Sequence, residues 1–193
     1  MNTITNIAIF ASGSGSNAQK IMGYFQGSEN IRVKYLLSNN KEAYALERAE
    51  KMGIETKIFN RRAFRESDEI VEFLVNNEVS WVILAGFLWM IPENLIKAFP
   101  HRIINIHPAL LPLYGGKGMY GMHVHTAVHK AKDKESGISI HLVNENYDEG
   151  EIIFQAKCLL DENDTPESIA EKVLKLEHEY FPKVIETLIK KSL

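Results

Sequence analysis

Cysteine, long apolar runs and an excess of positive charge are all scarce in this chain of 193 residues. Its single cysteine, Cys158, excludes a disulfide framework, which agrees with a reducing compartment. The longest nearly uncharged apolar run, from Trp81 to Ile91, is about half of the roughly 20 residues that a membrane helix needs. The first basic residue is Lys20, so no positively charged segment precedes the first apolar stretch. These absences predict a cytoplasmic protein with no membrane partner.

The charge balance argues against nucleic acid as a partner. The 22 lysine and arginine residues are outnumbered by 25 aspartate and glutamate residues, which leaves a formal net charge of -3. Binding to a nucleic-acid backbone normally needs a basic excess. A few donors that converge in one cleft can still hold a single phosphate, so a small anionic ligand stays compatible with this composition.

Hydrophobic residues make up 45% of the chain and charged residues 24%, which is the mixture of an ordinary globular protein. In the first half, short β-rich apolar runs alternate with longer segments of helical period, a pattern typical of a parallel sheet with crossover helices. The predicted strands are 4–11, 32–38, 56–59, 81–85 and 102–106, and the predicted helices are 17–25, 42–52, 64–76 and a short one from residue 92.

The second half predicts a long loop over 107–122, a helix over 124–132 and strands over 138–143 and 152–158. The connection between these two strands is too short for a crossover helix, so an antiparallel hairpin is expected. A final helix should begin at Pro166 with Thr165 as its N-cap, and Pro182 should kink or restart it. Its predicted apolar stripe consists of Ile169, Val173, Leu176 and Tyr180.

At about 150 residues per domain, this length predicts one domain over residues 1–193. The predicted fold class is α/β: a Rossmann-like mixed sheet, mostly parallel, with helices on both faces and an antiparallel C-terminal hairpin.

A loop rich in glycine and serine, residues 12–17, lies where the first strand should pass into the first helix. Gly13 and Gly15 would let the backbone approach a ligand, and free N–H groups at a helix start attract phosphate. The spacing to Ala18 also fits a dinucleotide fingerprint, but the second strand ends at Ser38 without the acidic residue that would hold a ribose. The loop therefore favours a monophosphate.

Two polar side chains mark the end of the predicted strand 102–106. Asn105 and His107 should project from the same face, because side chains alternate along a strand, and Pro108 ends the strand there. The carboxyl ends of strands are where open α/β sheets place ligands. An amide N–H beside a protonated imidazole, which supplies a second donor and a charge, can stabilise an oxyanion.

The acidic turn over residues 146–151 consists of ordinary turn-forming residues and indicates nothing alone. A carboxylate near His107 would nevertheless favour the charged ring and help to move a proton. Either Asp148 or Glu149 could supply it.

Four segments, in order along almost the whole chain, carry a resemblance to a known family. They are Ser12 to Asn17, Leu84-Ala85-Gly86-Phe87, Asn105-Ile106-His107-Pro108 with Leu110-Leu111-Pro112, and Tyr147-Asp148-Glu149-Gly150. In these segments the chain resembles the folate-dependent formyltransferases, in particular the branch that acts in de novo purine biosynthesis. The resemblance implies transfer of a formyl group from 10-formyltetrahydrofolate, a co-substrate, to the amine of glycinamide ribonucleotide through a tetrahedral intermediate. It implies small-molecule partners and no metal.

The resemblance also implies roles for individual residues. The implied catalytic residues are Asn105, His107 and Asp148, so the resemblance selects Asp148 over Glu149. The implied phosphate-binding residues are Gly13, Gly15, Ser16 and Asn17, and Glu177 matches the glutamate that binds ribose hydroxyls. The implied pterin site consists of Leu88, Trp89, Met90, Ile91 and Val143.

Two places depart from the family pattern. The loop 113–121 is longer than in the compact members, so contacts at the mouth of the site are left open. Some members carry a basic residue one helical turn before the ribose-binding glutamate, where this chain has Leu174. The groups that assist the glycine loop in holding the phosphate are therefore also left open. The run Arg61, Arg62 and Arg65 could meet a folate tail, although an exposed charge run is usually only solvated.

Three alternatives remain. A formyltetrahydrofolate hydrolase would pass the formyl group to water. A zinc-dependent hydrolase could use His123, His125 and His129, but the segment lacks the glutamate of the H-E-x-x-H pattern. A non-catalytic nucleotide sensor could use the glycine loop alone.

Overall fold

The fold is built around a seven-stranded sheet with the strand order β3-β2-β1-β4-β5-β6-β7. It is taken from a computed structural model and is described for residues 4–192. The strands are β1 (Thr5–Phe10), β2 (Ile31–Ser38), β3 (Glu55–Ile58), β4 (Val79–Leu84), β5 (Ile103–His107), β6 (Glu135–Leu142) and β7 (Ile152–Leu159). β1 to β5 pair in parallel, whereas β6 is antiparallel to both β5 and β7. The predicted mixed sheet and antiparallel hairpin are confirmed.

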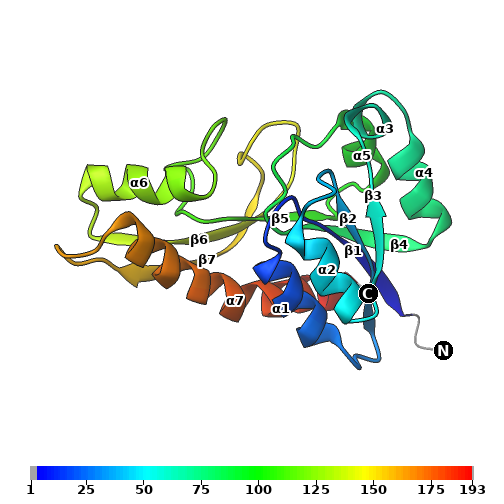
Figure 1. The fold of residues 1–193 in the computed structure, drawn as a ribbon, viewed down its shortest axis with the longest axis horizontal. Coiled ribbons are helices and arrows are strands. Elements are labelled where there is room, and N and C mark those ends of the chain that lie inside the picture. The colour runs from blue at the N-terminus through cyan, green and yellow to red at the C-terminus, as the bar shows by residue number, and fades with distance from the viewer. Residues whose placement is uncertain (1–3, 193) are drawn as a thin grey trace.

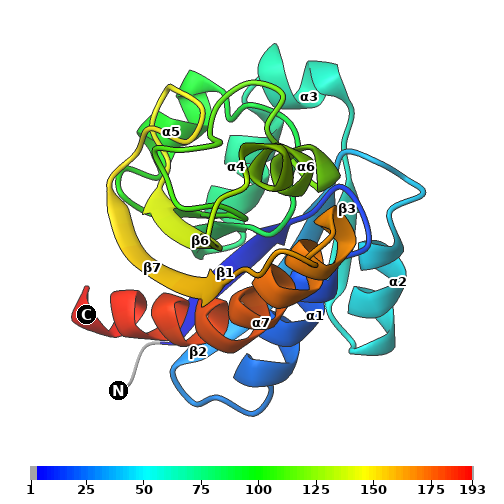
Figure 2. The same cartoon turned by 90° about the vertical axis from the view of Figure 1, so that its left-hand side faces the viewer.

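Helices cover both faces of the sheet (Figures 1 and 2). They are α1 (Ser16–Phe25), α2 (Tyr44–Lys51), α3 (Arg61–Arg65), α4 (Glu69–Asn76), α5 (Glu93–Ala98), α6 (Met122–Ala131) and α7 (Pro166–Lys191). None of the helices in residues 4–192 combines the length and the apolarity that crossing a bilayer requires.

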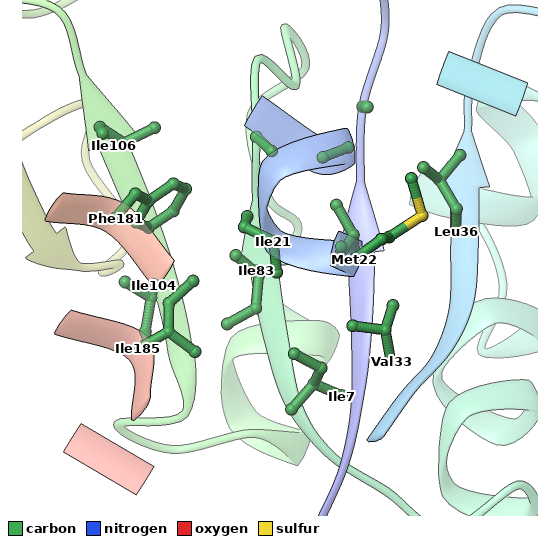
Figure 3. Close-up of a cluster of buried hydrophobic side chains, with 14 of the residues drawn as sticks. Ile7, Ile21, Met22, Val33, Leu36, Ile83, Ile104, Ile106, Phe181 and Ile185 are labelled. Atoms are coloured by element: carbon green, nitrogen blue, oxygen red, sulfur yellow. The ribbon is translucent and has the colours of Figure 1, made fainter. Parts of the chain in front are cut away.

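Two apolar cores form because successive strand residues point to opposite faces. On one face, Ile7 and Ile9 of β1 pack with side chains of α1, α2 and α7. Figure 3 shows this core, in which Ile104 of β5 lies beside Phe181 of α7. On the other face, Phe10 packs with α3, α4 and α5. The central strands β1 and β4 are therefore apolar on both sides, and their polar residues lie near their starts.

The helix predicted over 64–76 is wrong in one respect, since it is two helices, α3 and α4. The Ser67 hydroxyl in the break donates a hydrogen bond to the Ala63 carbonyl at 3.2 Å. Asp68 follows as the N-cap of α4. Serine and aspartate compete with helical hydrogen bonds through such local contacts, which the apolar periodicity does not reveal.

The last helix, α7, has Thr165 as its N-cap and Pro166 at its start, as predicted. It runs through Pro182 without restarting, because the side chains on both sides of this residue are anchored in the core. Its buried stripe recurs every fourth residue as Ile169, Val173, Glu177, Phe181, Ile185 and Ile189. Leu176 and Tyr180, predicted as part of the stripe, are only partly buried. An acidic residue therefore occupies the middle of an apolar face.

Replacing Thr165 with alanine should lower the free energy of unfolding by about 1 kcal/mol, the usual cost of a lost N-cap. The Thr165 hydroxyl accepts from the Ser168 N–H at 3.2 Å, and the Ser168 hydroxyl accepts in return from the Thr165 N–H at 3.0 Å. Thermal unfolding measures the change, expected as a fall in Tm of about 2–4 °C. Thr187→Ala, at an exposed position near the end of the same helix, is the control and should change Tm little. Equal Tm values for the two variants would contradict the capping role.

Candidate active site

A cavity of about 920 Å³ opens at the carboxyl ends of β1, β4 and β5. Its walls come from the segments that follow these strands, from the loop between β6 and β7 and from one face of α7. Parallel strands end at the same edge of a sheet, so residues far apart in sequence meet there.

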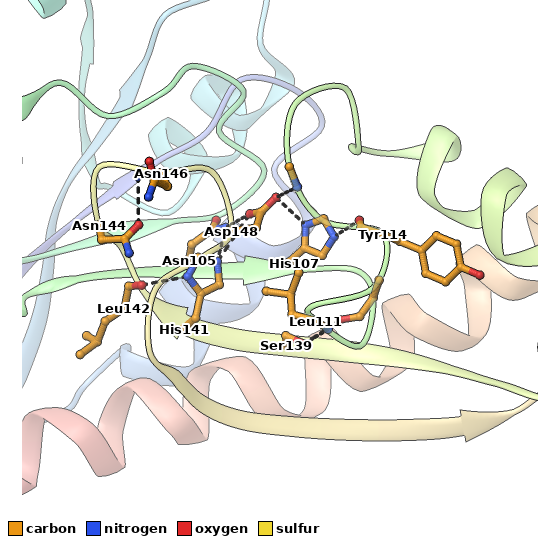
Figure 4. Close-up of polar contacts among 12 residues, drawn as sticks. Asn105, His107, Leu111, Tyr114, Ser139, His141, Leu142, Asn144, Asn146 and Asp148 are labelled. Atoms are coloured by element: carbon orange, nitrogen blue, oxygen red, sulfur yellow. Dashed lines mark hydrogen bonds and ion pairs between the residues drawn. The ribbon is translucent and has the colours of Figure 1, made fainter.

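Asn105 and His107 of β5 face this cavity, and Asp148 approaches them from the loop between β6 and β7 (Figure 4). Asn105 Nδ2 lies 3.4 Å from Asp148 Oδ1. His107 Nδ1 lies 3.6 Å from Asp148 Oδ2. Glu149, the other carboxylate that the turn offered, is exposed. The structure thus brings the three side chains of the implied catalytic set within a few ångströms of one another.

The Asp148 carboxylate is held in its ionised form. Burial alone would raise its pKa, but contacts with His141, His107 and the Gly116 N–H together bring the pKa below its usual value. The Gly116 N–H donates to Asp148 Oδ2 at 2.9 Å. Gly116 belongs to the long loop that the sequence left unexplained, so this loop contributes a donor to the carboxylate.

His141 of β6 is a member of the site that sequence reasoning missed. It is the cross-strand partner of Asn105 in the β5–β6 pairing, and it is only 2% exposed. Its Nε2 lies 3.0 Å from Asn105 Nδ2 and 3.6 Å from Asp148 Oδ1. Because an amide nitrogen can only donate, the short contact makes Nε2 the acceptor. A histidine in the alternating apolar and polar run 138–142 was the available signal.

His107 departs from the predicted role in one respect. Its Nε2 lies 2.7 Å from the Tyr114 carbonyl oxygen, which can only accept, so Nε2 carries the hydrogen. With Nδ1 facing Asp148, neither ring nitrogen is free to act as the second oxyanion donor. Burial lowers the pKa of His107, against the raising effects of Asp148 and the Tyr114 carbonyl. The ring can still contribute a positive charge when it is protonated.

Buried histidines should make the protein less stable in mild acid. Burial is the largest cause of the lowered pKa of His107, His125 and His178. A folded-state pKa below the unfolded value of about 6.5 means that the unfolded chain binds protons more readily. This part of the stability is therefore complete above about pH 6.5 and is lost as the pH falls toward the folded-state pKa.

We expect Tm to fall between about pH 7.5 and about pH 5.5, above the range where most carboxylates titrate. The raised pKa of the buried Glu177 has the opposite effect on stability, so the fall should be larger in Glu177→Gln. His125→Gln should show a smaller fall in Tm, because this variant removes one of the three histidines with a lowered pKa. His129→Gln changes an exposed histidine on the same helix and should behave as the parent protein. A Tm independent of pH over this range would contradict the prediction.

The glycine loop and Glu177 line the opposite part of the cavity. Gly15 has a φ of 71° in the left-handed region and serves as the N-cap of α1. Asn17 Nδ2 donates to Glu177 Oε2 at 2.7 Å, and this carboxylate is only 8% exposed. Burial raises the pKa of Glu177, and the bond from Asn17 only partly offsets the effect. The Glu177 carboxylate is thus a hydrogen-bond acceptor held in an apolar wall of the cavity.

The residues of the implied pterin site also line the cavity, and they are Leu88, Trp89, Met90, Ile91 and Val143. The Trp89 ring packs against Phe59 and Phe64, with ring centroids 6.1 and 5.9 Å apart. Arg61, Arg62 and Arg65 are all exposed on α3, and Arg65 Nη2 lies 3.4 Å from the Met90 carbonyl oxygen. This region offers an apolar, aromatic surface for a flat ring.

The histidines proposed for zinc do not form a cluster. His125 is buried in the cavity wall, whereas His123 and His129 are exposed. Within residues 4–192, no three His, Cys, Asp or Glu side chains are grouped so as to hold a metal ion.

Comparisons with known proteins place this fold and its cavity in a family. The family model for formyl transferases matches residues 5–185, so the chain belongs to the formyl transferase family. Among curated relatives, the chloroplastic phosphoribosylglycinamide formyltransferase of Arabidopsis thaliana is 44% identical over 185 residues. That alignment covers 93% of this chain and 63% of the plant protein, so the chain spans less than two thirds of that relative.

Bacterial relatives are closer in length. The phosphoribosylglycinamide formyltransferase of Bacillus subtilis is 36% identical over 189 residues, which cover 94% of this chain and 93% of that protein. The crystal structure of phosphoribosylglycinamide formyltransferase from Anaplasma phagocytophilum superposes with a TM-score of 0.88 at 32% identity. The superposition covers 98% of this chain and 89% of the Anaplasma phagocytophilum chain.

Proposed function

We propose that the protein transfers the formyl group of 10-formyltetrahydrofolate to the primary amine of glycinamide ribonucleotide, in purine biosynthesis. The observation that carries this proposal is the meeting, in one cavity, of a phosphate-type glycine loop with the Asn105, His107 and Asp148 cluster. The names of the relatives agree with it. In this proposal the chain acts as one formyltransferase domain over residues 1–193.

The ribonucleotide would bind along the wall formed by α1 and α7. The N–H groups of Gly13, Gly15, Ser16 and Asn17 lie at a helix start, where a phosphate is favoured. The Glu177 carboxylate would accept hydrogen bonds from the ribose hydroxyls. These hydroxyls would add to the hydrogen bond that the carboxylate accepts from Asn17. The amine would then extend toward the polar cluster.

The folate would place its pterin against the apolar segment Leu88 to Ile91 and Val143. This orientation brings the formyl carbon to the end of β5, where the ribonucleotide amine attacks it. The reaction needs only proton transfer and charge stabilisation, which side chains can supply, so the proposal includes no metal.

Attack of the amine forms a tetrahedral intermediate with a negative oxygen. Asn105 Nδ2 would donate to this oxygen, and the long 3.4 Å contact with Asp148 is the one that it would give up. His107, when protonated, adds a positive charge, which the adjacent Asp148 favours. Asp148 would accept the proton that leaves the amine and pass it, directly or through water, to the departing folate nitrogen.

One assay tests the proposal and separates it from the hydrolase. The protein is mixed with glycinamide ribonucleotide and 10-formyltetrahydrofolate, then with each omitted in turn, and the deformylated folate is followed spectroscopically. Product is expected only when both substrates are present. Product without the ribonucleotide would indicate a formyltetrahydrofolate hydrolase instead. Binding of the ribonucleotide without any turnover would indicate a sensor.

A further inference from the structure

We propose that Arg48 of α2 is a positioning residue that aims the N–H groups of the loop 13–17 at the phosphate of the substrate. The inference rests on the proposed function, because it concerns the same phosphate. It identifies a group that assists the loop in a chain that has Leu174, rather than a basic residue, one turn before Glu177.

Two successive carbonyl groups of the loop are turned toward α2. The Ala45 N–H donates to the Gly13 carbonyl oxygen at 3.1 Å, and Arg48 Nε donates to the Ser14 carbonyl oxygen at 2.8 Å. In a trans peptide the C=O and the following N–H point in opposite directions. The N–H groups of Ser14 and Gly15 must therefore point away from α2.

The next peptide continues this arrangement. The Gly15 carbonyl oxygen accepts from the Gln19 N–H at 2.8 Å in the first turn of α1. The Ser16 N–H consequently points out of the start of the helix. Within residues 4–192, the N–H groups of residues 13–17 have no hydrogen-bond acceptor. Consecutive donors are thus oriented for an anion, at the end of a helix whose dipole favours negative charge.

The loop also lies too close to α2 to adopt other positions. A Cβ atom at Gly15 would stand 2.5 Å from Ala45 Cβ, and its φ of +71° is strained for any other residue. The close approach fixes the backbone at Gly15, and the Gly13 carbonyl is bonded to the Ala45 N–H. Arg48 is the side chain that holds the Ser14 peptide.

Arg48 is itself held in a fixed orientation. Its guanidinium lies over the Tyr44 ring, 4.7 Å from the centroid, and also donates to Gln19 Oε1. A planar guanidinium held in this way loses little further freedom on bonding the Ser14 carbonyl. Arg48 does not line the cavity, so it acts through the loop and not as a direct ligand.

The positive charge of Arg48 acts on nearby groups of α7. Its field contributes to the lowered pKa of His178, although burial is the larger cause and Lys20 contributes as well. A cation beyond the Ser14 carbonyl polarises the peptide so that the Gly15 N–H becomes a stronger donor. Orientation and polarisation therefore both favour the phosphate.

Three variants test the proposal. Arg48→Gln keeps a donor of shorter reach and loses the charge. Arg48→Lys keeps the charge and loses the planar Nε–H. Lys51→Gln removes a charge from the exposed face of the same helix and serves as the matched control. Lys51 pairs with Glu47 and also lies over the Tyr44 ring, 5.5 Å from its centroid, so this variant further tests whether the ring contact alone matters. Each is assayed by calorimetric titration with ribose 5-phosphate, by steady-state kinetics and by thermal unfolding.

We expect the Kd for ribose 5-phosphate and the KM for glycinamide ribonucleotide to rise about tenfold in Arg48→Gln, the size of a lost charged hydrogen bond. Arg48→Lys should lie between this variant and the parent, and Lys51→Gln should match the parent. The kcat and the KM for 10-formyltetrahydrofolate should not change in any variant.

The possible failures are distinguishable. If the parent protein binds ribose 5-phosphate and Arg48→Gln binds it equally well, this inference is overturned and the proposed function stands. An equal loss of affinity for both substrates in Arg48→Gln would show general damage and also overturn it. If the parent binds no ribose 5-phosphate, the loop is not a phosphate site, and both proposals fail.

Discussion

Replacing Asn105 with alanine is expected to lower kcat about 100- to 1000-fold, the usual loss for one oxyanion-hole donor. The KM values for both substrates should change only a few-fold, because this donor acts mainly on the charge that develops in the transition state. Asn105 Nδ2 is placed for this role by its 3.0 Å contact with His141 Nε2, which fixes the plane of the amide.

Steady-state kinetics at saturating substrate measures this effect, and calorimetric binding of the ribonucleotide checks that the cavity is intact. Asn94→Ala removes a similar amide from α5, outside the cavity, and should leave kcat unchanged. Near-full turnover in Asn105→Ala, together with normal substrate binding, would remove this residue from the mechanism.

Replacing Glu177 with glutamine is expected to have two opposite effects, higher stability and weaker binding of the ribonucleotide. The carboxylate is 8% exposed on the apolar face of α7, and its one side-chain donor is Asn17. Burial raises its pKa above the unfolded value, so the folded protein loses stability as the pH rises from the unfolded pKa toward the folded pKa. Glutamine removes this loss and still accepts from Asn17.

At neutral pH, Glu177→Gln should unfold about 2–4 °C above the parent, which corresponds to about 1 kcal/mol for a chain of this length. The KM for glycinamide ribonucleotide should rise about tenfold or more, because hydrogen bonds to a charged carboxylate are stronger than those to an amide. Glu179→Gln, at an exposed position beside it that pairs with Lys183, should change neither quantity.

An unchanged KM in Glu177→Gln would show that this side chain does not bind the ribose. A lower Tm would show that the carboxylate stabilises the fold and is not an acceptor kept there for the ligand. Because stability and binding are measured separately, each half of this prediction can fail alone.

Much of the fold could be predicted because its causes are local. The run of apolar residues in β1, the glycines after it and the polar start of α1 each depend on near neighbours in sequence. The N-cap at Thr165 depends on Ser168, three residues away. The break between α3 and α4 was missed because Phe64 and Val71, seven residues apart, share a helical face, although the five residues between Phe64 and Ile70 are all polar. The hydrogen bond of Ser67 marks the break in the structure.

The candidate site could be predicted only in part. Asn105 and His107 share a strand, so their common face follows from alternation. Local pattern alone left the choice between Asp148 and Glu149 open, because both belong to the same turn. His141 was missed because its position beside Asn105 depends on the register between β5 and β6, which are separated by a long loop and a helix.

The sequence by itself determined the order of strands and helices, the phosphate-type loop and the polar end of β5, since each arises from residues close together in the chain. Only the tertiary structure decided that the Tyr114 carbonyl accepts a hydrogen bond from His107 Nε2, that Glu177 lies in an apolar face of α7, and that Arg48 bonds the Ser14 carbonyl. Those contacts join residues on different elements. They depend on how the sheet and its helices pack as a whole, which no short stretch of sequence specifies.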